Sequence, residues 1–159
     1  CKKRAELTNL VVFGIIGALL TGIAIGTQST LSSRIGSVIG NLKTGVLMNL
    51  IGGMIAGLIF IVILIVRGKG FWQLPGTTLV MLVIAGTLGI LIITGVSFSL
   101  QKTGVAAGLS TMILGQLIVS VIVDAKGWGG AAPVPITLTR LLGLVVMAAG
   151  VFLLIPKNS

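Results

Sequence analysis

Four polar side chains inside or beside long apolar runs are the residues of this sequence that could do chemistry. Gln116 and Asn49 each carry an amide within an apolar run, Gln28 follows the first run, and Asp124 directly follows the fourth. An amide in hydrocarbon needs a hydrogen-bonding partner, so it either lines a path for a polar substrate or holds two helices together. Asp124 could gate such a path at the membrane surface, or it could cap its helix or form an ion pair with Lys126 or Arg140.

The apolar runs also carry a few hydroxyl side chains. Serine and threonine can bond to a carbonyl of their own helix, so we interpret most of them as structural. The spacing of Thr111 or Met112 with Gln116 and Ser120 nevertheless predicts one helical stripe. The hydroxyl residues of the third and fourth runs are Thr94, Ser97, Ser99, Ser110, Thr111 and Ser120.

Most catalytic chemistry lacks the residues that it needs. The chain has no histidine, one cysteine and only two acids, Glu6 and Asp124, which lie at the edges of apolar runs. These residues provide neither the usual set of soft metal ligands nor paired carboxylates or a Ser-His-Asp triad. We therefore expect a protein that is not an enzyme, with no metal and no cofactor.

The elements that must position these side chains are five apolar runs, each about long enough to span a bilayer as a helix. Hydrophobic residues make up 55% of the 159 residues and charged ones 8%, with a mean hydropathy of +1.22. The runs are continuous rather than alternating, which favours helices over a lipid-facing barrel. We predict an all-α, polytopic membrane bundle that forms a single domain over residues 1–159, with spans at about 10–27, 46–66, 77–100, 104–123 and 136–155.

The connections between the runs contain residues that end or begin helices. The first span is predicted to continue as a short interfacial helix that breaks near Gly40 and Asn41. Residues 101–103 are expected to form a tight loop between the third and fourth spans. Thr137 is a candidate N-cap for the fifth span. Arg34, Trp72, Trp128 and Arg140 are predicted interfacial anchors.

The net charge of +9 comes from cations scattered singly at span ends, which does not favour nucleic-acid binding. Five spans place seven cations on the side of the N-terminus and four on the other side, so the distribution favours an N-in orientation. The sequence starts at Cys1, a candidate for lipidation, which would require the opposite orientation. The alternative is a trimmed chain.

Glycine is abundant, with 24 residues, and several glycines form small faces on the predicted spans. Gly22 and Gly26 form one such face in the first span, and Gly53 and Gly57 form another in the second. Gly104 and Gly108 repeat the spacing in the fourth. Small faces allow helices to approach closely in lipid, or allow them to rock against each other around a substrate path.

Several segments of this sequence form a recognisable pattern. They are Gly22, Gln28 and 34–36 in the first half, 103–106 at the entry to the fourth span, and 115–129, Pro135, 139–143 and 149–151 in the second half. With these residues the chain resembles a family of five-helix bacterial inner-membrane exporters in the drug/metabolite transporter superfamily. The resemblance covers nearly the whole chain and is most specific in its second half.

The resemblance implies a small-molecule exporter of the bacterial inner membrane, with five helices as half of a ten-helix transporter. It further implies action as a homodimer or with a sister five-helix chain. The substrate path would involve Gln28, Asn49, Gln116 and Asp124. The small multidrug relatives use a glutamate in the first span, which this chain lacks. A second hypothesis is a non-transporting structural subunit of a larger membrane complex, anchored by a lipid on Cys1.

Overall fold

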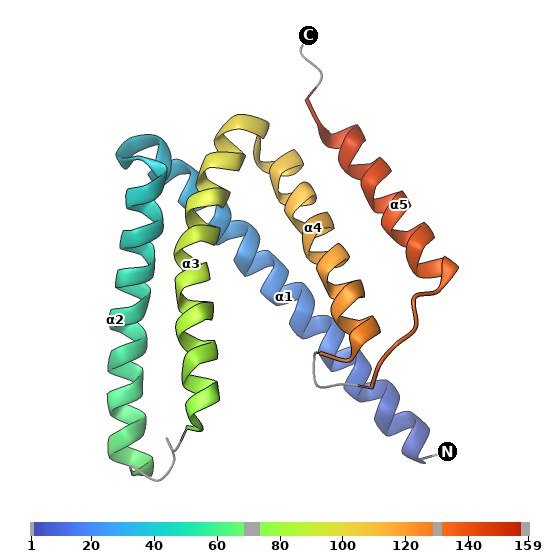
Figure 1. Ribbon diagram of the computed structural model, residues 1–159, viewed down its shortest axis with the longest axis horizontal. Coiled ribbons are helices and arrows are strands. Elements are labelled where there is room, and N and C mark those ends of the chain that lie inside the picture. The colour runs from blue at the N-terminus through green and yellow to red at the C-terminus, as the bar shows by residue number, and fades with distance from the viewer. Residues whose placement is uncertain (1, 69–73, 129–131, 157–159) are drawn as a thin grey trace. The chain divides into compact units, whose positions relative to one another are not determined.

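The computed structural model describes residues 2–68, 74–128 and 132–156, and side chains from Val11 onward. These ranges contain five helices and no strands (Figure 1), as the all-α prediction required. The helices are α1 (Lys2–Ile39), α2 (Asn41–Arg67), α3 (Gly76–Thr103), α4 (Val105–Lys126) and α5 (Leu138–Leu154).

Four of these helices, α1 to α4, are long and apolar enough to cross a membrane. Helix α5 is apolar and has 17 residues, which is at the lower limit of about 17 for a spanning helix. It begins two residues later than predicted because Thr137 is extended and caps it, with the Thr137 hydroxyl accepting a hydrogen bond from the Arg140 backbone N–H at 3.4 Å. The predicted N-cap is thus confirmed.

Two glycines with positive φ separate consecutive helices. Gly40, at φ +91°, is the single residue between α1 and α2, so the predicted helical extension of the first span and its break are confirmed. Gly104, at φ +79°, alone separates α3 from α4. The loop predicted at residues 101–103 was wrong, because those residues carry no helix breaker and continue α3. Gly104 therefore lies outside the fourth helix and not on its small face.

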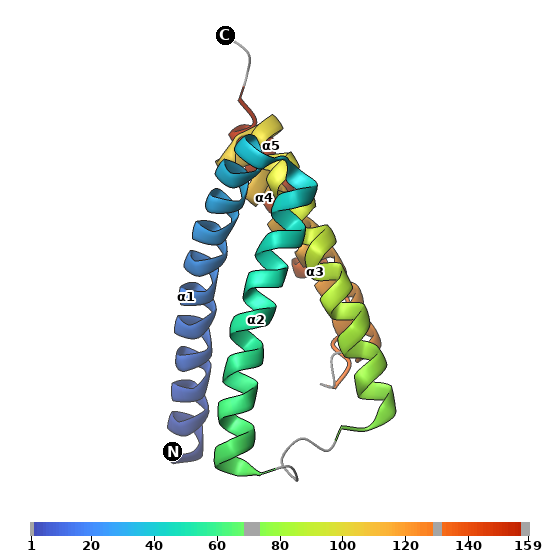
Figure 2. The ribbon, with the colours of Figure 1, turned by 90° about the vertical axis from the view of Figure 1, so that its left-hand side faces the viewer.

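The chain divides into two compact units, Cys1–Ser97 and Phe98–Ser159, called unit 1 and unit 2 below. Unit 1 contains α1, α2 and most of α3. Figure 2 shows α1 and α2 meeting at the Gly40 turn, and the two helices pack on each other there. The buried residues of unit 1 near this turn are small: Ser29, Ser32, Gly36, Thr44, Gly45 and Ser97.

Unit 2 contains the end of α3 together with α4 and α5, which pack on each other. Its buried apolar residues are Leu100, Ala107 and Val151. Gly108 lies directly beneath the end of α3, since a Cβ added there would come within 2.9 Å of both the Leu100 Cδ1 and the Thr103 Oγ1 atoms. A small residue at this point lets α4 fold back against the end of α3.

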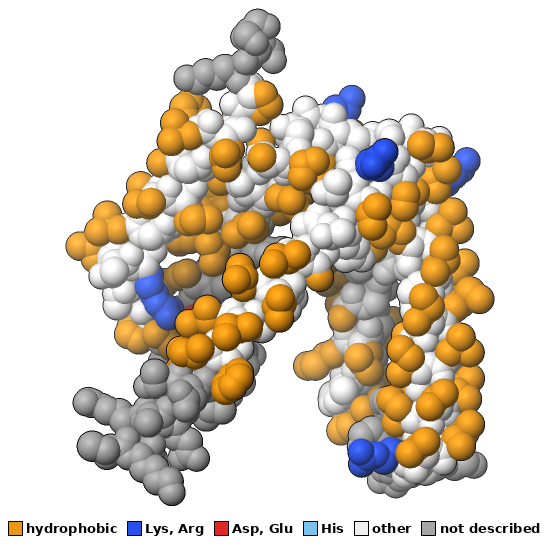
Figure 3. All heavy atoms as spheres, turned by 180° about the vertical axis from the view of Figure 1, so that it is seen from behind, with side chains coloured by type: hydrophobic (Ala, Val, Ile, Leu, Met, Phe, Trp, Pro, Cys, Tyr) orange, Lys and Arg blue, Asp and Glu red, His pale blue; other side chains and the backbone are white. Residues whose placement is uncertain are grey.

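Most large apolar side chains of both units are exposed rather than buried. Figure 3 shows hydrophobic side chains covering the helix surfaces, with the few Lys and Arg side chains near helix ends. A water-soluble domain would bury much of this surface, whereas a bilayer supplies an apolar solvent for it. The pattern is that of a multi-pass membrane protein whose small residues make the contacts inside each unit.

Gly45 provides a test of this packing, because a side chain at this position has no room. A Cβ added at Gly45 would clash with Thr94 Oγ1 and lie 2.8 Å from the backbone oxygen of Ile90 on α3. We expect Gly45→Ala to lower the free energy of unfolding by about 1–3 kcal/mol. Gly52→Ala is the matched control on the same helix, since nothing lies within 4 Å of its added Cβ. Unfolding in mixed detergent micelles, followed by circular dichroism, measures both, and equal stabilities would contradict the packing.

Candidate functional site

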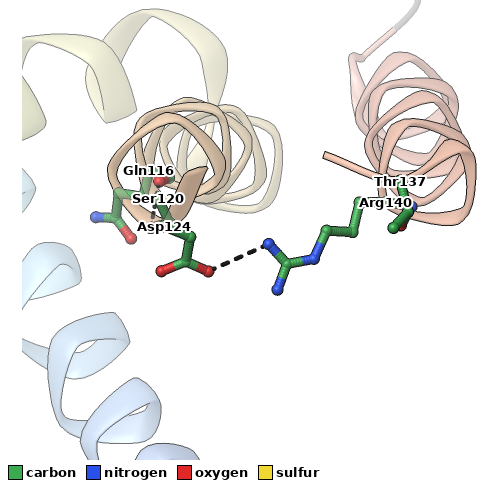
Figure 4. A network of polar contacts seen from close by, with 5 residues as sticks. All are labelled: Gln116, Ser120, Asp124, Thr137 and Arg140. Carbon is green, nitrogen blue, oxygen red and sulfur yellow. Dashed lines mark hydrogen bonds and ion pairs between the residues drawn. The ribbon is translucent and has the colours of Figure 1, made fainter. Parts of the chain in front are cut away.

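One face of α4 carries three polar side chains in successive turns. Gln116, Ser120 and Asp124 are spaced by four residues each, and Figure 4 shows them stacked along the helix axis. The Ser120 hydroxyl donates a hydrogen bond to the Gln116 backbone oxygen at 2.8 Å, so this hydroxyl is satisfied by its own helix. The Gln116 side chain is exposed near the middle of the helix. We call these three residues the α4 polar stripe.

The stripe ends in an ion pair between α4 and α5. The Nη1 atom of Arg140 lies 3.4 Å from Oδ2 of Asp124, and Figure 4 shows the two side chains pointing toward each other. Both side chains are partly exposed, at 33% for Arg140 and 49% for Asp124. The contact is long for a charge-assisted hydrogen bond, which is usually about 2.7–2.9 Å. The pair is therefore a weak link that can open at small cost.

The backbone around this ion pair holds its two partners in place. The Asp124 carbonyl oxygen accepts hydrogen bonds from the N–H groups of Gly127 at 3.2 Å and Val134 at 3.0 Å. The second bond ties the segment before α5 to the end of α4. The Thr137 cap then fixes the first turn of α5, where Arg140 lies. Position is thus set by the backbone, and the two charged side chains keep rotational freedom.

The predicted anchors have different surroundings. Trp128 is exposed by 71%, and the Lys126 Nζ atom lies 4.4 Å from its ring centroid, a cation–π contact at the end of α4. Arg34 is exposed on the last turns of α1. Arg140 is in the ion pair described above, and Trp72 lies outside the described residues.

A second polar cluster lies in unit 1 and is buried. The Ser97 hydroxyl lies 3.0 Å from the Ser32 backbone oxygen and 2.8 Å from Asn41 Oδ1, and its single proton serves these two acceptors. The Ser32 hydroxyl donates to the Ile93 backbone oxygen at 3.4 Å. Ser32 and Ser97 are 1% and 0% exposed. These contacts join α1, α2 and α3, and we call this cluster the serine junction.

The sequence analysis flagged Ser97 but missed Ser32 and Asn41. The signal was available: Ser29 and Ser32 are one helical turn apart, just before the glycine break at Gly40. Small hydroxyl residues beside a sharp turn allow three helices to approach closely in lipid. The sequence does not reveal the whole cluster, because Asn41 comes close to Ser97 only in the folded chain.

Asn49 and Gln28 also belong to unit 1. The Asn49 amide donates a hydrogen bond to the Gly45 backbone oxygen at 2.8 Å, and its Oδ1 atom would lie 2.8 Å from a Cβ added at Gly89. Asn49 therefore packs across α2 and α3. Gln28 is exposed on α1. Thr94 Oγ1 is buried against Gly45 and has no hydrogen-bond partner within the described part of the chain.

This arrangement offers polar groups that can bind a solute. In the described ranges, no group of three or more His, Cys, Asp or Glu side chains could hold a metal ion. The α4 polar stripe supplies an amide and a carboxylate, and the carboxylate faces the guanidinium of Arg140 on α5. Such groups can bind and release a polar solute by hydrogen bonds and charge. Cys1, the candidate for lipidation, lies outside the described residues.

The helices and this polar stripe define a multi-pass helical membrane protein with polar groups on a spanning helix. The family model described as "Putative inner membrane exporter, YdcZ" matches residues 13–153. The chain belongs to this exporter family, so its class is that of a membrane transporter rather than an enzyme, and the family resemblance drawn from the sequence is confirmed. A comparison with curated proteins found no match, and neither did one with solved structures.

The serine junction generates a stability prediction. Ser97→Ala removes the hydroxyl that serves two buried acceptors, and we expect the free energy of unfolding to fall by about 1–3 kcal/mol. Ser37→Ala is the matched control, because the exposed Ser37 hydroxyl bonds only to the Arg34 carbonyl of its own helix at 2.7 Å. Its effect should stay within about 0.5 kcal/mol. Equal losses from both substitutions would show that the junction does not hold the three helices together.

Proposed function

We propose that this protein is a secondary transporter that exports a small polar molecule, with the α4 polar stripe lining the substrate path. The observation that carries the proposal is the exposed amide of Gln116 on a membrane-spanning helix. Family membership supports the direction and the membrane, since the family is one of inner-membrane exporters. The bacterial inner membrane, with the N-terminus inside, is the proposed location.

The depth of Gln116 supports this use. It lies eleven residues from the start of α4 and ten from its end, which is about 15 Å from either end at 1.5 Å per residue. That places the amide close to the middle of a hydrocarbon core about 30 Å thick. An amide facing lipid there would lose its hydrogen bonds to water without replacement. We therefore infer that the stripe faces a water-filled path or a polar partner surface.

We assign different roles to the four candidate residues. Gln116 and the exposed Gln28 would bind the substrate through their amides. Asp124, held weakly by Arg140, would act as a gate that opens when the ion pair breaks. The contacts of Asn49 with Gly45 and Gly89 favour the helix-packing role for this residue. A gate built on a long, partly exposed pair can open and close at low cost.

We further propose that the transporter acts as a dimer, with a second copy or a sister five-helix chain. Two small faces support this proposal: Gly22 and Gly26 on α1, and Gly53 and Gly57 on α2. No atom of a neighbouring element lies within 4 Å of a Cβ added at any of the four, in the part of unit 1 whose side chains are described. The packing within that part leaves these faces uncovered, and we infer that they are available to a partner helix. Inverted pairing of two such halves would enclose a path at their interface.

The alternative of a lipid-anchored accessory subunit receives no support from the family match. The state of assembly distinguishes this alternative from the dimeric transporter. Native mass spectrometry of the detergent-extracted protein should show a dimer of unmodified chains. A chain heavier by a lipid group, bound to unrelated membrane subunits, would contradict the dimeric transporter.

Transport itself can be tested without knowing the substrate. Liposomes containing the purified protein are loaded with the water-soluble small molecules of a bacterial extract, and mass spectrometry identifies what leaves them. We expect at least one compound to leave only in the presence of the protein. Gln116→Leu should reduce this efflux by about tenfold, which corresponds to the loss of one hydrogen bond, without lowering the unfolding temperature.

Thr87→Leu is the matched control for that experiment. Thr87 is an exposed polar residue of α3 whose hydroxyl bonds to the Val83 carbonyl of its own helix at 2.9 Å. Efflux through this variant should stay close to that of the unsubstituted protein. If no compound leaves the liposomes, the transporter proposal fails. Equal efflux through both variants would place the path away from the α4 polar stripe.

A further inference from the structure

The Asp124–Arg140 pair has a feature that ordinary stabilising ion pairs lack. Asp124 lies in the last turn of α4, and Arg140 lies in the first turn of α5. The C-terminal end of a helix carries partial negative charge and the N-terminal end partial positive charge. Each side chain therefore has the same sign as the helix end that bears it. Both helix dipoles oppose this placement, so helix stability does not explain it.

The same arrangement creates a strongly polarised site. The end of α4 and the Asp124 carboxylate are both negative, while the start of α5 and the Arg140 guanidinium are both positive. The two poles face each other across the 3.4 Å contact between Oδ2 and Nη1. A ligand that carries one ammonium and one carboxylate would complement both poles at once. It would replace the existing pair without leaving either charge without a counter-charge.

We propose that this site selects small zwitterions of the amino-acid type, with the ammonium on Asp124 and the carboxylate on Arg140. This inference rests on the proposed function, since it names the class of solute that the exporter carries. The guanidinium is suited to it, because its planar fork can bind a carboxylate through two parallel hydrogen bonds, whereas its bond to Asp124 uses Nη1 alone. The partial exposure of both side chains lets the ligand reach them.

Selectivity follows from charge balance. A cation bound to Asp124 would leave Arg140 without a counter-charge, and an anion bound to Arg140 would do the same to Asp124. Only a ligand with both charges makes a charge-assisted contact with each partner at once. Beyond the pair, Ser120 and Gln116 continue along the same face for about 12 Å, at 1.5 Å per residue. The stripe therefore offers a polar route for the zwitterion from the charged site toward the middle of α4.

The test compares matched ligands on the purified full-length protein. Each standard L-amino acid is first screened for its effect on the unfolding temperature in detergent. The one that stabilises most is then compared by calorimetry with its methyl ester, a cation, and its N-acetyl derivative, an anion. We expect the zwitterion to bind about tenfold more tightly than either derivative, because each derivative loses one of the two charge-assisted contacts.

Two variants should change the preference in opposite directions. Arg140→Gln leaves the Asp124 carboxylate without its cationic partner, so the methyl ester should become the preferred ligand. Asp124→Asn leaves the Arg140 guanidinium without its anionic partner, so the N-acetyl derivative should become the preferred ligand. A merely structural pair would not produce such a crossing. Lys102→Gln is the control, because it removes a cation of the last turn of α3 and should leave the zwitterion preferred.

Three results would overturn the inference: no amino acid stabilises the protein, a singly charged derivative binds as tightly as the zwitterion, or both variants keep the zwitterion preferred. If the variants do not fold, the comparison of the three ligands on the unsubstituted protein still decides. Efflux of some other compound from the loaded liposomes would preserve the exporter function while excluding zwitterions. Absence of any efflux would instead remove the function on which the inference rests.

Discussion

A polar group inside a bilayer has no water to bind, and this constraint governs where every polar side chain of the protein can lie. Hydroxyls can meet it locally: those of Thr21, Thr87 and Thr111 all bond to a carbonyl four residues earlier. The serine junction meets it by joining three helices. The Gln116 amide has neither kind of hydrogen-bonding partner within the described chain, and its side chain is exposed on a spanning helix. That difference separates structural polar residues from the candidate substrate path.

The same solvent explains why small residues make the close contacts. Lipid tails are as apolar as leucine, so burying large apolar side chains gives little advantage, and helices associate through close approach and hydrogen bonds. Gly45 lies against α3, and Gly108 lies beneath the end of α3. Most leucines and isoleucines remain on the outside of both units, and the buried Leu100 is an exception. The glycine faces on α1 and α2 are the contacts that we propose for a partner chain.

Charge is used sparingly, and its placement is informative. Most cations lie near helix ends, where the headgroup region accommodates them. Asp124 is different, because its carboxylate forms an ion pair with a cation of another helix, Arg140. The pair is long and partly exposed, and each partner opposes its own helix dipole. These properties are the basis of our proposal that the site exchanges partners.

The sequence by itself determined the helical membrane class, the break near Gly40, the Thr137 cap and the family, because hydropathy, helix breakers and caps act locally along the chain. It misjudged residues 101–103, where only Gly104 interrupts the helix. Tertiary structure alone decided that Asn49 packs on Gly89, that Ser97 meets Ser32 and Asn41, and that Asp124 pairs with Arg140 rather than with Lys126. Such contacts join residues on different helices, and no local pattern specifies which faces meet.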